Sequence, residues 1–151
     1  MTVHVRVPAT TANLGPGFDV LGMALGLWNE IHAEPAPRLD IDISGEGADV
    51  LPRDETNLTY QAMLRLADHV GRALPPVRLR MVNRIPLQAG VGSSSAAIVG
   101  GLCTAAALLD VSLPRADLLR LAVEIEGHPD NVAPALYGAW SRWPWTRKVP
   151  S

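Results

Sequence analysis

Three short stretches of the chain alternate apolar and charged residues with a period of two. They are residues Val3–Val7, Leu39–Ile43 and Val77–Val82. This alternation is typical of strands that bury one face and leave the other polar. A longer strand is predicted over Met23–Ala33, with Gly26 as the position of a bulge, and the prolines that follow are expected to end its pairing.

Apolar residues follow a helical spacing in three further stretches. Residues 57–70 repeat apolar side chains every three or four positions after a group of capping residues, which predicts a helix with one buried face. Ser94–Leu109 is apolar on nearly every side and rich in Ala and Gly, so we expect a buried helix packed closely on its neighbours. A third helix is predicted to start at Ser112, with Pro114 in its first turn, and to end at Gly127. This order of elements predicts an α+β fold, with helices on one side of a mostly antiparallel sheet.

Size, charge and cysteine content narrow the functional classes. The 151 residues suffice for one domain with a hydrophobic core. Lys and Arg number 13 against 15 Asp and Glu, a net charge of −2 that argues against a nucleic-acid or membrane-surface partner. The lone Cys103 excludes an internal disulfide and a cysteine-based zinc site. No signal-peptide core opens the chain, and the apolar run Ala96–Leu109 is shorter than the ~20 residues of a membrane span, so we expect a cytoplasmic protein.

The stretch PLQAGVGSSSAA, residues 86–97, connects a predicted strand to the predicted buried helix. Helix N-termini carry unpaired N–H groups and partial positive charge. Glycines before such an end let the backbone curl around an anion, and serine hydroxyls add donors or a metal ligand, as in a phosphate cradle. The stretch is no Walker A loop, because no Gly-Lys-Ser/Thr follows, and Ser95 stands where a dinucleotide fingerprint has its third glycine. Taken alone, a serine-rich helix cap explains these residues equally well.

Two other stretches favour the phosphate cradle over the helix cap. They are PATTANLGPGFDVLGMAL, residues 8–25, and EIEGHPDNVAPALYG, residues 124–138. Together with residues 86–97, they resemble the homoserine kinases of the galactokinase, homoserine kinase, mevalonate kinase and phosphomevalonate kinase superfamily. Gly-Ser-Ser-Ser-Ala marks the superfamily, whereas the pairing of ANLGPGFD with HPDNVAP is specific to homoserine kinases. The resemblance implies a fold like domain 2 of ribosomal protein S5, and transfer of the ATP γ-phosphoryl group to the side-chain hydroxyl of L-homoserine in threonine synthesis.

The resemblance also implies a site for ATP and Mg²⁺. The residues expected around the ATP phosphates are Pro86, Gly90, Val91, Gly92, Ser93, Ser94, Ser95 and Ala96, with Asn57 near the adenine. Ser94 resembles the family's magnesium-contacting hydroxyl, and Glu124 is its expected partner, with Glu126 as the rival carboxylate. Glu124 also stands four residues after Arg120, a spacing common for ion pairs on an exposed helix face.

By the same resemblance, the residues expected to contact the substrate are Asn13, Asp19, His128 and Asn131. Asn131 stands where mevalonate kinase has an aspartate base, and an amide can orient a hydroxyl but cannot remove its proton. Catalysis by Ser94, Glu124 and Asn131 is therefore expected to rest on positioning and charge neutralisation. Simpler roles remain open: Asn13 and Asp19 suit a turn, His128 a helix end, and Asp130 a helix cap.

The resemblance stops after Gly138, where the sequence becomes AWSRWPWTRKVPS. Family members continue with a second half that carries another phosphate loop and substrate-binding arginines. We therefore expect an N-terminal ATP-binding domain over residues 1–138, a divergent tail over 139–151, and no C-terminal domain. Little activity and self-association through exposed apolar surface, including a homodimer, are the expected consequences. The alternatives are a non-catalytic nucleotide-binding remnant and a kinase of the same superfamily with another acceptor.

Overall fold

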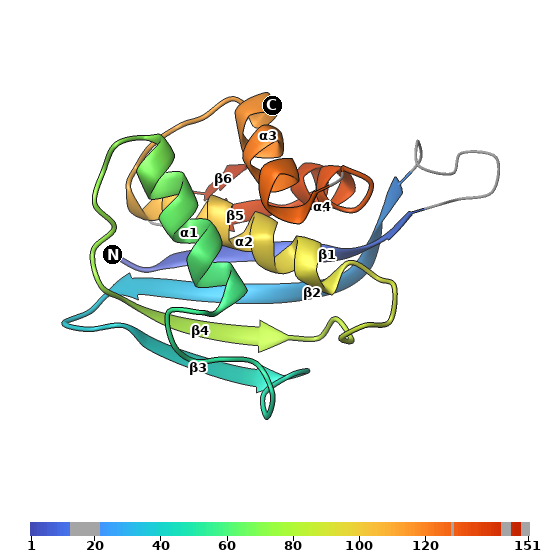
Figure 1. Ribbon diagram of the computed structural model, residues 1–151, viewed down its shortest axis with the longest axis horizontal. Coiled ribbons are helices and arrows are strands. Elements are labelled where there is room, and N and C mark those ends of the chain that lie inside the picture. Colours follow the sequence, from blue (N-terminus) through green and yellow to red (C-terminus); the bar gives the residue numbers. More distant parts are fainter. Residues whose placement is uncertain (13–21, 128, 143–145, 149–151) are drawn as a thin grey trace.

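The computed structural model describes residues 1–12, 22–127, 129–142 and 146–148 (Figure 1). Its elements, in chain order, are β1 (Val3–Ala12), β2 (Gly22–Pro35), β3 (Asp40–Gly45), α1 (Leu58–His69), β4 (Val77–Asn83), α2 (Ser93–Leu108), α3 (Arg115–Glu126), α4 (Val132–Gly138), β5 (Trp140–Arg142) and β6 (Thr146–Lys148). No helix in these ranges is long and apolar enough to cross a membrane.

The described strands form one sheet in the order β3-β4-β2-β1-β5-β6. The β3–β4 pair is parallel, and every other pair is antiparallel. The predicted alternation holds along β4, where Val77, Leu79 and Met81 are buried and Arg78 and Arg80 are exposed. Gly26 lies at a bulge, as predicted, because Pro8 pairs with Trp28 whereas Thr10 pairs with Ala24.

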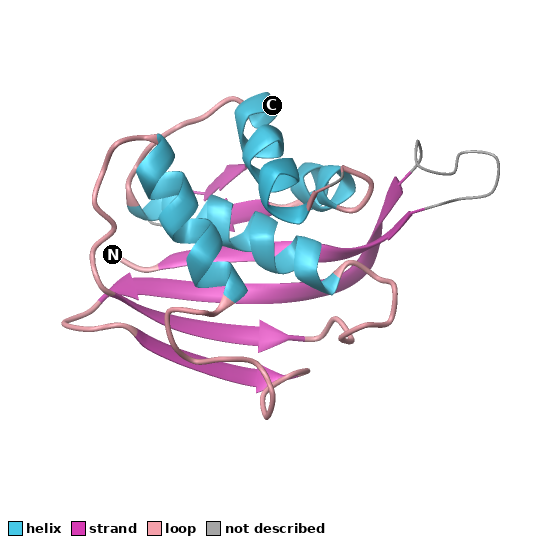
Figure 2. Ribbon diagram, viewed as in Figure 1, coloured by secondary structure: helices cyan, strands magenta, loops and turns pink. Residues whose placement is uncertain are grey.

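The four described helices all cover one face of this sheet (Figure 2). The central helix is α2, which packs on β1 and β2 and also contacts α1, α3 and α4. Its glycines permit this close packing: a side chain at Gly101 would collide with the backbone carbonyl of Thr59 on α1. The predicted α+β fold, with helices on one side of a mostly antiparallel sheet, is confirmed.

Strand β2 runs two residues past the predicted Ala33 and includes Pro35, which lies opposite Val77 of β4, so this proline does not end the pairing as expected. The boundaries of α3 and β1 differ more. Helix α3 begins at Arg115, because Pro114 is its extended N-cap (φ −55°, ψ 144°) and not part of its first turn. Strand β1 continues past Val7 to Ala12, although the alternation of apolar and charged residues ends there. Pairing with β2 carries this extension, since Thr10, Thr11 and Ala12 lie opposite residues 22–24.

Candidate functional site

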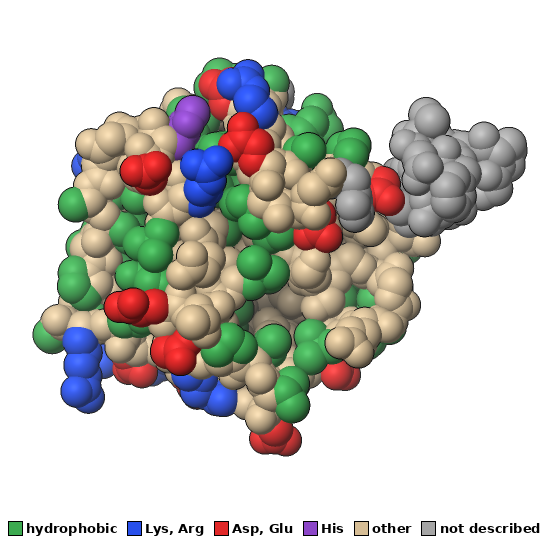
Figure 3. All heavy atoms as spheres, viewed as in Figure 1, with side chains coloured by type: hydrophobic (Ala, Val, Ile, Leu, Met, Phe, Trp, Pro, Cys, Tyr) green, Lys and Arg blue, Asp and Glu red, His purple; other side chains and the backbone are tan. Residues whose placement is uncertain are grey.

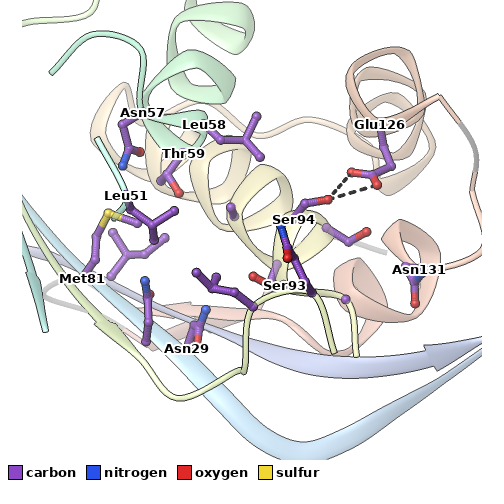
Figure 4. A pocket seen from close by; sticks show the side chains of 18 of the residues that line it. Asn29, Leu51, Asn57, Leu58, Thr59, Met81, Ser93, Ser94, Glu126 and Asn131 are labelled. Atoms are coloured by element: carbon purple, nitrogen blue, oxygen red, sulfur yellow. Dashed lines mark hydrogen bonds between the residues drawn. The ribbon is translucent and has the colours of Figure 1, made fainter. Parts of the chain in front are cut away.

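A cavity of about 580 Å³ lies between the glycine-serine loop, the start of α2, the start of α1, and strands β2 and β4. The helix-covered face is hollowed there (Figure 3). One end is apolar, with Leu51, Leu58 and Met81, and the other is polar, with Ser93, Ser94, Glu126 and Asn131 (Figure 4). The cavity is therefore amphipathic along its length, as expected of a site for a ligand with one apolar and one polar end.

The glycine-serine loop is shaped by backbone conformations that glycine adopts readily. Gly90 and Gly92 have φ values of 71° and 77°, and Gly92 is the N-cap of α2. The Thr10 amide donates to the Val91 carbonyl at 2.9 Å, which ties the loop to β1. A side chain at Gly92 would collide with the Thr10 hydroxyl, so this position requires glycine on two grounds.

The N-terminus of α2 opens into the polar end of the cavity. The Ala96 amide donates to the Gly92 carbonyl at 2.9 Å, and Gly92, as the N-cap, supplies no side-chain cap. The backbone amides of residues 93–95 lie in the first turn of α2, where the helix offers them no carbonyl acceptor. Ser93, Ser94 and Ser95 all line the cavity, so the backbone amides of three successive residues lie where an anion can bind.

Ser94 and Glu126 meet at the polar end. The Ser94 hydroxyl lies 3.0 Å from Oε1 and 2.9 Å from Oε2 of Glu126, to which it donates (Figure 4). Glu124, the expected partner, instead accepts a hydrogen bond from Nη2 of Arg65 on α1 at 2.8 Å and does not line the cavity. Residues two apart on a helix point about 200° from one another, so only one of the two carboxylates can face Ser94. The geometry thus favours Glu126 over Glu124 as the carboxylate partner of Ser94.

Asn131 reaches the cavity from the start of α4 and is held by Thr10. The Thr10 hydroxyl, which is fully buried, donates to Oδ1 of Asn131 at 2.8 Å. With Oδ1 bound in this way, the NH₂ group of the same amide is the part of Asn131 that can serve a ligand. Sequence reasoning did not single out Thr10, because its partner lies 121 residues away.

The apolar end of the cavity contains the buried hydroxyl of Thr59. Thr59 is 1% exposed and lines the cavity beside Leu51 and Met81, and its Oγ1 has no hydrogen-bond partner among the described residues (Figure 4). An unsatisfied buried polar group costs about 1–3 kcal/mol, so this hydroxyl is a candidate ligand contact. No sequence pattern pointed to it, since a threonine in the first turn of a helix is ordinary.

Asn57 has a structural task in addition to lining the cavity. Its Oδ1 accepts from the Tyr60 amide at 3.2 Å, and its Nδ2 donates to the Pro52 carbonyl at 2.9 Å, so it caps α1. Asn29 plays a similar part for the loop, because its Oδ1 accepts from the amides of Arg84 and Ile85 at 2.8 and 3.0 Å. Both asparagines fix the backbone that frames the cavity.

Most of the site residues expected from sequence meet in this one cavity. Those that line it are Asn57, Gly90, Gly92, Ser93, Ser94, Ser95, Ala96 and Asn131. Pro86 lies in a neighbouring shallow depression with residues 45–50, and Val91 contributes its carbonyl to Thr10. Asn13, Asp19 and His128 lie outside the described residues.

The charge of the cavity determines which ligands suit it. Among the described residues that line it, Glu126 is the only charged one, and no Lys or Arg accompanies it. Phosphates would therefore meet amides, hydroxyls and the positive end of α2, and a cation would be needed to offset the carboxylate. A hydroxyl and a carboxylate are hard oxygen donors that suit Mg²⁺.

Comparison with known proteins relates this chain to one kinase family. The sequence profile "GHMP kinases N terminal domain" matches residues 57–139, which include α2, the serines and Glu126. A homoserine kinase from Carboxydothermus hydrogenoformans is 53% identical over 137 residues, covering 90% of this chain and 45% of that protein. A homoserine kinase from Thermosynechococcus vestitus is 43% identical, covering 99% of this chain and 54% of that protein.

A solved structure has the same architecture. The crystal structure of homoserine kinase from Cytophaga hutchinsonii matches with a TM-score of 0.77 and 32% identity, covering 93% of this chain and 48% of that one. The chain thus spans about half the length of the relatives it matches.

Proposed function

The chain belongs to the GHMP kinase family, and on that premise we propose that it is the ATP-binding half of a homoserine kinase. The reaction is transfer of the γ-phosphoryl group of ATP to the side-chain hydroxyl of L-homoserine. The observation that carries the proposal is the convergence of the glycine-serine loop, the Ser94–Glu126 pair and Asn131 on one cavity. The proposal includes an ATP-binding domain over residues 1–138 and a divergent tail over 139–151. The match of the family profile to residues 57–139 supports the larger part of that domain.

The nucleotide lies along the cavity in this proposal. Its phosphates bind the amides and hydroxyls of residues 93–95 at the positive end of α2, and its adenine occupies the apolar end beside Leu51 and Met81. Ser94 and Glu126 are the residues that would hold Mg²⁺, which supplies positive charge to the phosphates. Glu126 takes the role that the sequence assigned to Glu124, because Glu124 is turned toward Arg65.

Asn131 positions the acceptor hydroxyl through its NH₂ group, while Thr10 fixes the amide through Oδ1. An amide cannot accept the hydroxyl proton, so the rate enhancement comes from alignment and from stabilisation of phosphoryl charge. The homoserine contacts at Asn13, Asp19 and His128 are proposed from the resemblance alone. A cytoplasmic location is proposed on the same basis.

A second proposal concerns the function of the isolated 151-residue chain. The homoserine kinases that the chain matches are about twice its length, so for the isolated chain we propose nucleotide binding with little or no turnover. Exposed apolar side chains, among them Met23, Val50 and Tyr137, favour the proposed homodimer. A superfamily kinase with another acceptor, such as mevalonate or a sugar, is the competing assignment.

Two experiments test the proposal. Calorimetry on the 151-residue chain should show ATP binding that strengthens with Mg²⁺, and coupled assays with L-homoserine should show no turnover above a heat-treated control. A chimera that joins residues 1–138 to the C-terminal half of the Carboxydothermus relative should phosphorylate L-homoserine. A folded chain that does not bind ATP would refute the nucleotide site, and a folded chimera that prefers mevalonate or a sugar would refute the acceptor.

A further inference from the structure

Two histidines and a glutamate share the sheet face that the helices do not cover. His4 of β1 and His32 of β2 are directly opposite one another in the antiparallel register, and Glu30 precedes His32 by two residues. Side chains alternate along a strand, so these three lie on one face, while the buried Val3 and Val5 lie on the other. The same alternation along β2 sends Asn29 and Ile31 toward the ATP cavity, so the cluster lies behind that cavity, across the sheet.

The three side chains already lie close together. The rings of His4 and His32 are stacked with centroids 4.2 Å apart and an interplanar angle of 11°. Nε2 of His4 is 3.3 Å from Oε1 of Glu30, and one ligand atom from each residue lies within 4.8 Å of the other two. The side chains of His4 and Glu30 are 24% and 21% exposed, so a small ion can reach them while their positions stay restricted by packing.

We propose that His4, Glu30 and His32 form a binding site for a transition-metal dication of the zinc type. Two imidazole nitrogens and one carboxylate oxygen are a donor set typical of Zn²⁺ sites with an open fourth position, whereas Mg²⁺ and Ca²⁺ prefer oxygen donors throughout. Donor atoms around a tetrahedral Zn²⁺ stand roughly 3.3–3.6 Å apart. The present spacing approaches this, and rotation of the stacked rings about their side-chain torsions brings the nitrogens into convergence.

Neighbouring arginines orient the carboxylate and limit the affinity. Nη1 of Arg84 lies 3.0 Å from Oε2 of Glu30, which leaves Oε1 directed toward His4. Hydrogen bonds of this kind to the second oxygen commonly position a metal-binding carboxylate. Nε of Arg6 lies 3.7 Å from Oε1, and its guanidinium covers the Trp28 ring at 4.7 Å. Repulsion from these two cations makes the site weaker than structural zinc sites, and this site is independent of the proposed kinase function.

The test uses the whole chain, purified without a polyhistidine tag, with Co²⁺ as a spectroscopic probe and Zn²⁺ as competitor. We expect visible absorption bands of a four- or five-coordinate Co²⁺ site at one equivalent, and their loss when Zn²⁺ is added. His4→Ala, His32→Ala and Glu30→Gln should each weaken binding by about tenfold or more. His69→Ala is the matched control, because His69 is an exposed histidine at the end of α1, and it should leave binding unchanged.

A second measurement does not depend on the folding of variants. In the wild-type chain, Zn²⁺ should protect His4 and His32 from acylation by diethyl pyrocarbonate, as measured by peptide mass spectrometry, and should leave His69 reactive. The proposal is wrong if the folded chain gives no Co²⁺ bands, or if His4 and His32 gain no more protection than His69. Equal loss of affinity in the His69→Ala control would also overturn it.

Discussion

The hydroxyl of Ser94 lies within 3.0 Å of both carboxylate oxygens of Glu126, whereas Glu124 is paired with Arg65 at 2.8 Å. Because both glutamates are on α3, the packing of that helix determines which of them belongs to the cavity.

Glu126→Gln should reduce the gain in ATP affinity that Mg²⁺ confers by about 10–100-fold, because a bond to a charged group contributes about 1.5–3 kcal/mol. Glu124→Gln is the matched control and should leave that gain unchanged, since it only breaks an exposed ion pair. Calorimetry with and without Mg²⁺ measures the ATP affinity of each variant. The opposite ranking of the two variants would restore Glu124 as the metal ligand.

Gly92→Ala should impair ATP binding far more than Gly90→Ala. Both positions have positive φ values, so both substitutions carry a backbone strain of about 1–2 kcal/mol. Only at Gly92 does the new side chain also collide with the Thr10 hydroxyl, whereas Gly90 has open space. The larger Gly92→Val change should abolish ATP binding in a protein that stays folded by far-UV circular dichroism. Equal effects at the two glycines, or unchanged affinity in folded Gly92→Val, would mean that the serines only cap α2.

Thr59→Val should move stability and affinity in opposite directions. It replaces a buried hydroxyl that has no hydrogen-bond partner among the described residues by a methyl group of similar shape, which should raise the free energy of unfolding by about 1–3 kcal/mol. If that hydroxyl contacts the nucleotide, ATP affinity should fall by severalfold, the value of one hydrogen bond of about 0.5–1.5 kcal/mol. Thermal unfolding and calorimetry on the same variant provide the two values. If Thr59→Val raises stability but leaves ATP affinity unchanged, Thr59 does not contact the nucleotide.

The reactivity of the Cys103 thiol should measure unfolding of the chain. Cys103 lies on α2 and is buried, and burial raises the pKa of its thiol to about 12. The native chain should therefore not react with iodoacetamide at pH 8, and labelling should occur only as the chain unfolds. Rapid labelling of folded protein would contradict this burial.

The same pKa shift predicts a pH dependence of stability. The folded state keeps the Cys103 proton above pH 9 while the unfolded state releases it, so the free energy of unfolding falls as pH rises toward 12. This group contributes at most about 1.4 kcal/mol per pH unit to that slope. Comparison of denaturant unfolding at pH 8 and pH 10.5 should show a steeper loss in wild type than in Cys103→Ala. Identical slopes would contradict the raised pKa.

Local patterns in the sequence determined most of the elements. The alternation in β4 and the unbroken apolar run of α2 predicted their type and extent to within a residue or two, because each depends on neighbours along the same strand or helix. The glycine-serine stretch by itself left two interpretations open, an anion site and a serine-rich helix cap, because both use the amides and hydroxyls at a helix start. Only its combination with residues 8–25 and 124–138 favoured the anion site.

Tertiary structure alone decided which distant groups meet. The resemblance favoured Glu124 over Glu126 as the partner of Ser94, whereas the packing of α3 directs Glu124 toward Arg65 and Glu126 toward Ser94. Thr10 and Asn131 are 121 residues apart, and His4 meets His32 through the β1–β2 register. Sequence periodicity specifies which face of an element is buried, but the partner across that face depends on strand order and helix packing, which involve the whole chain.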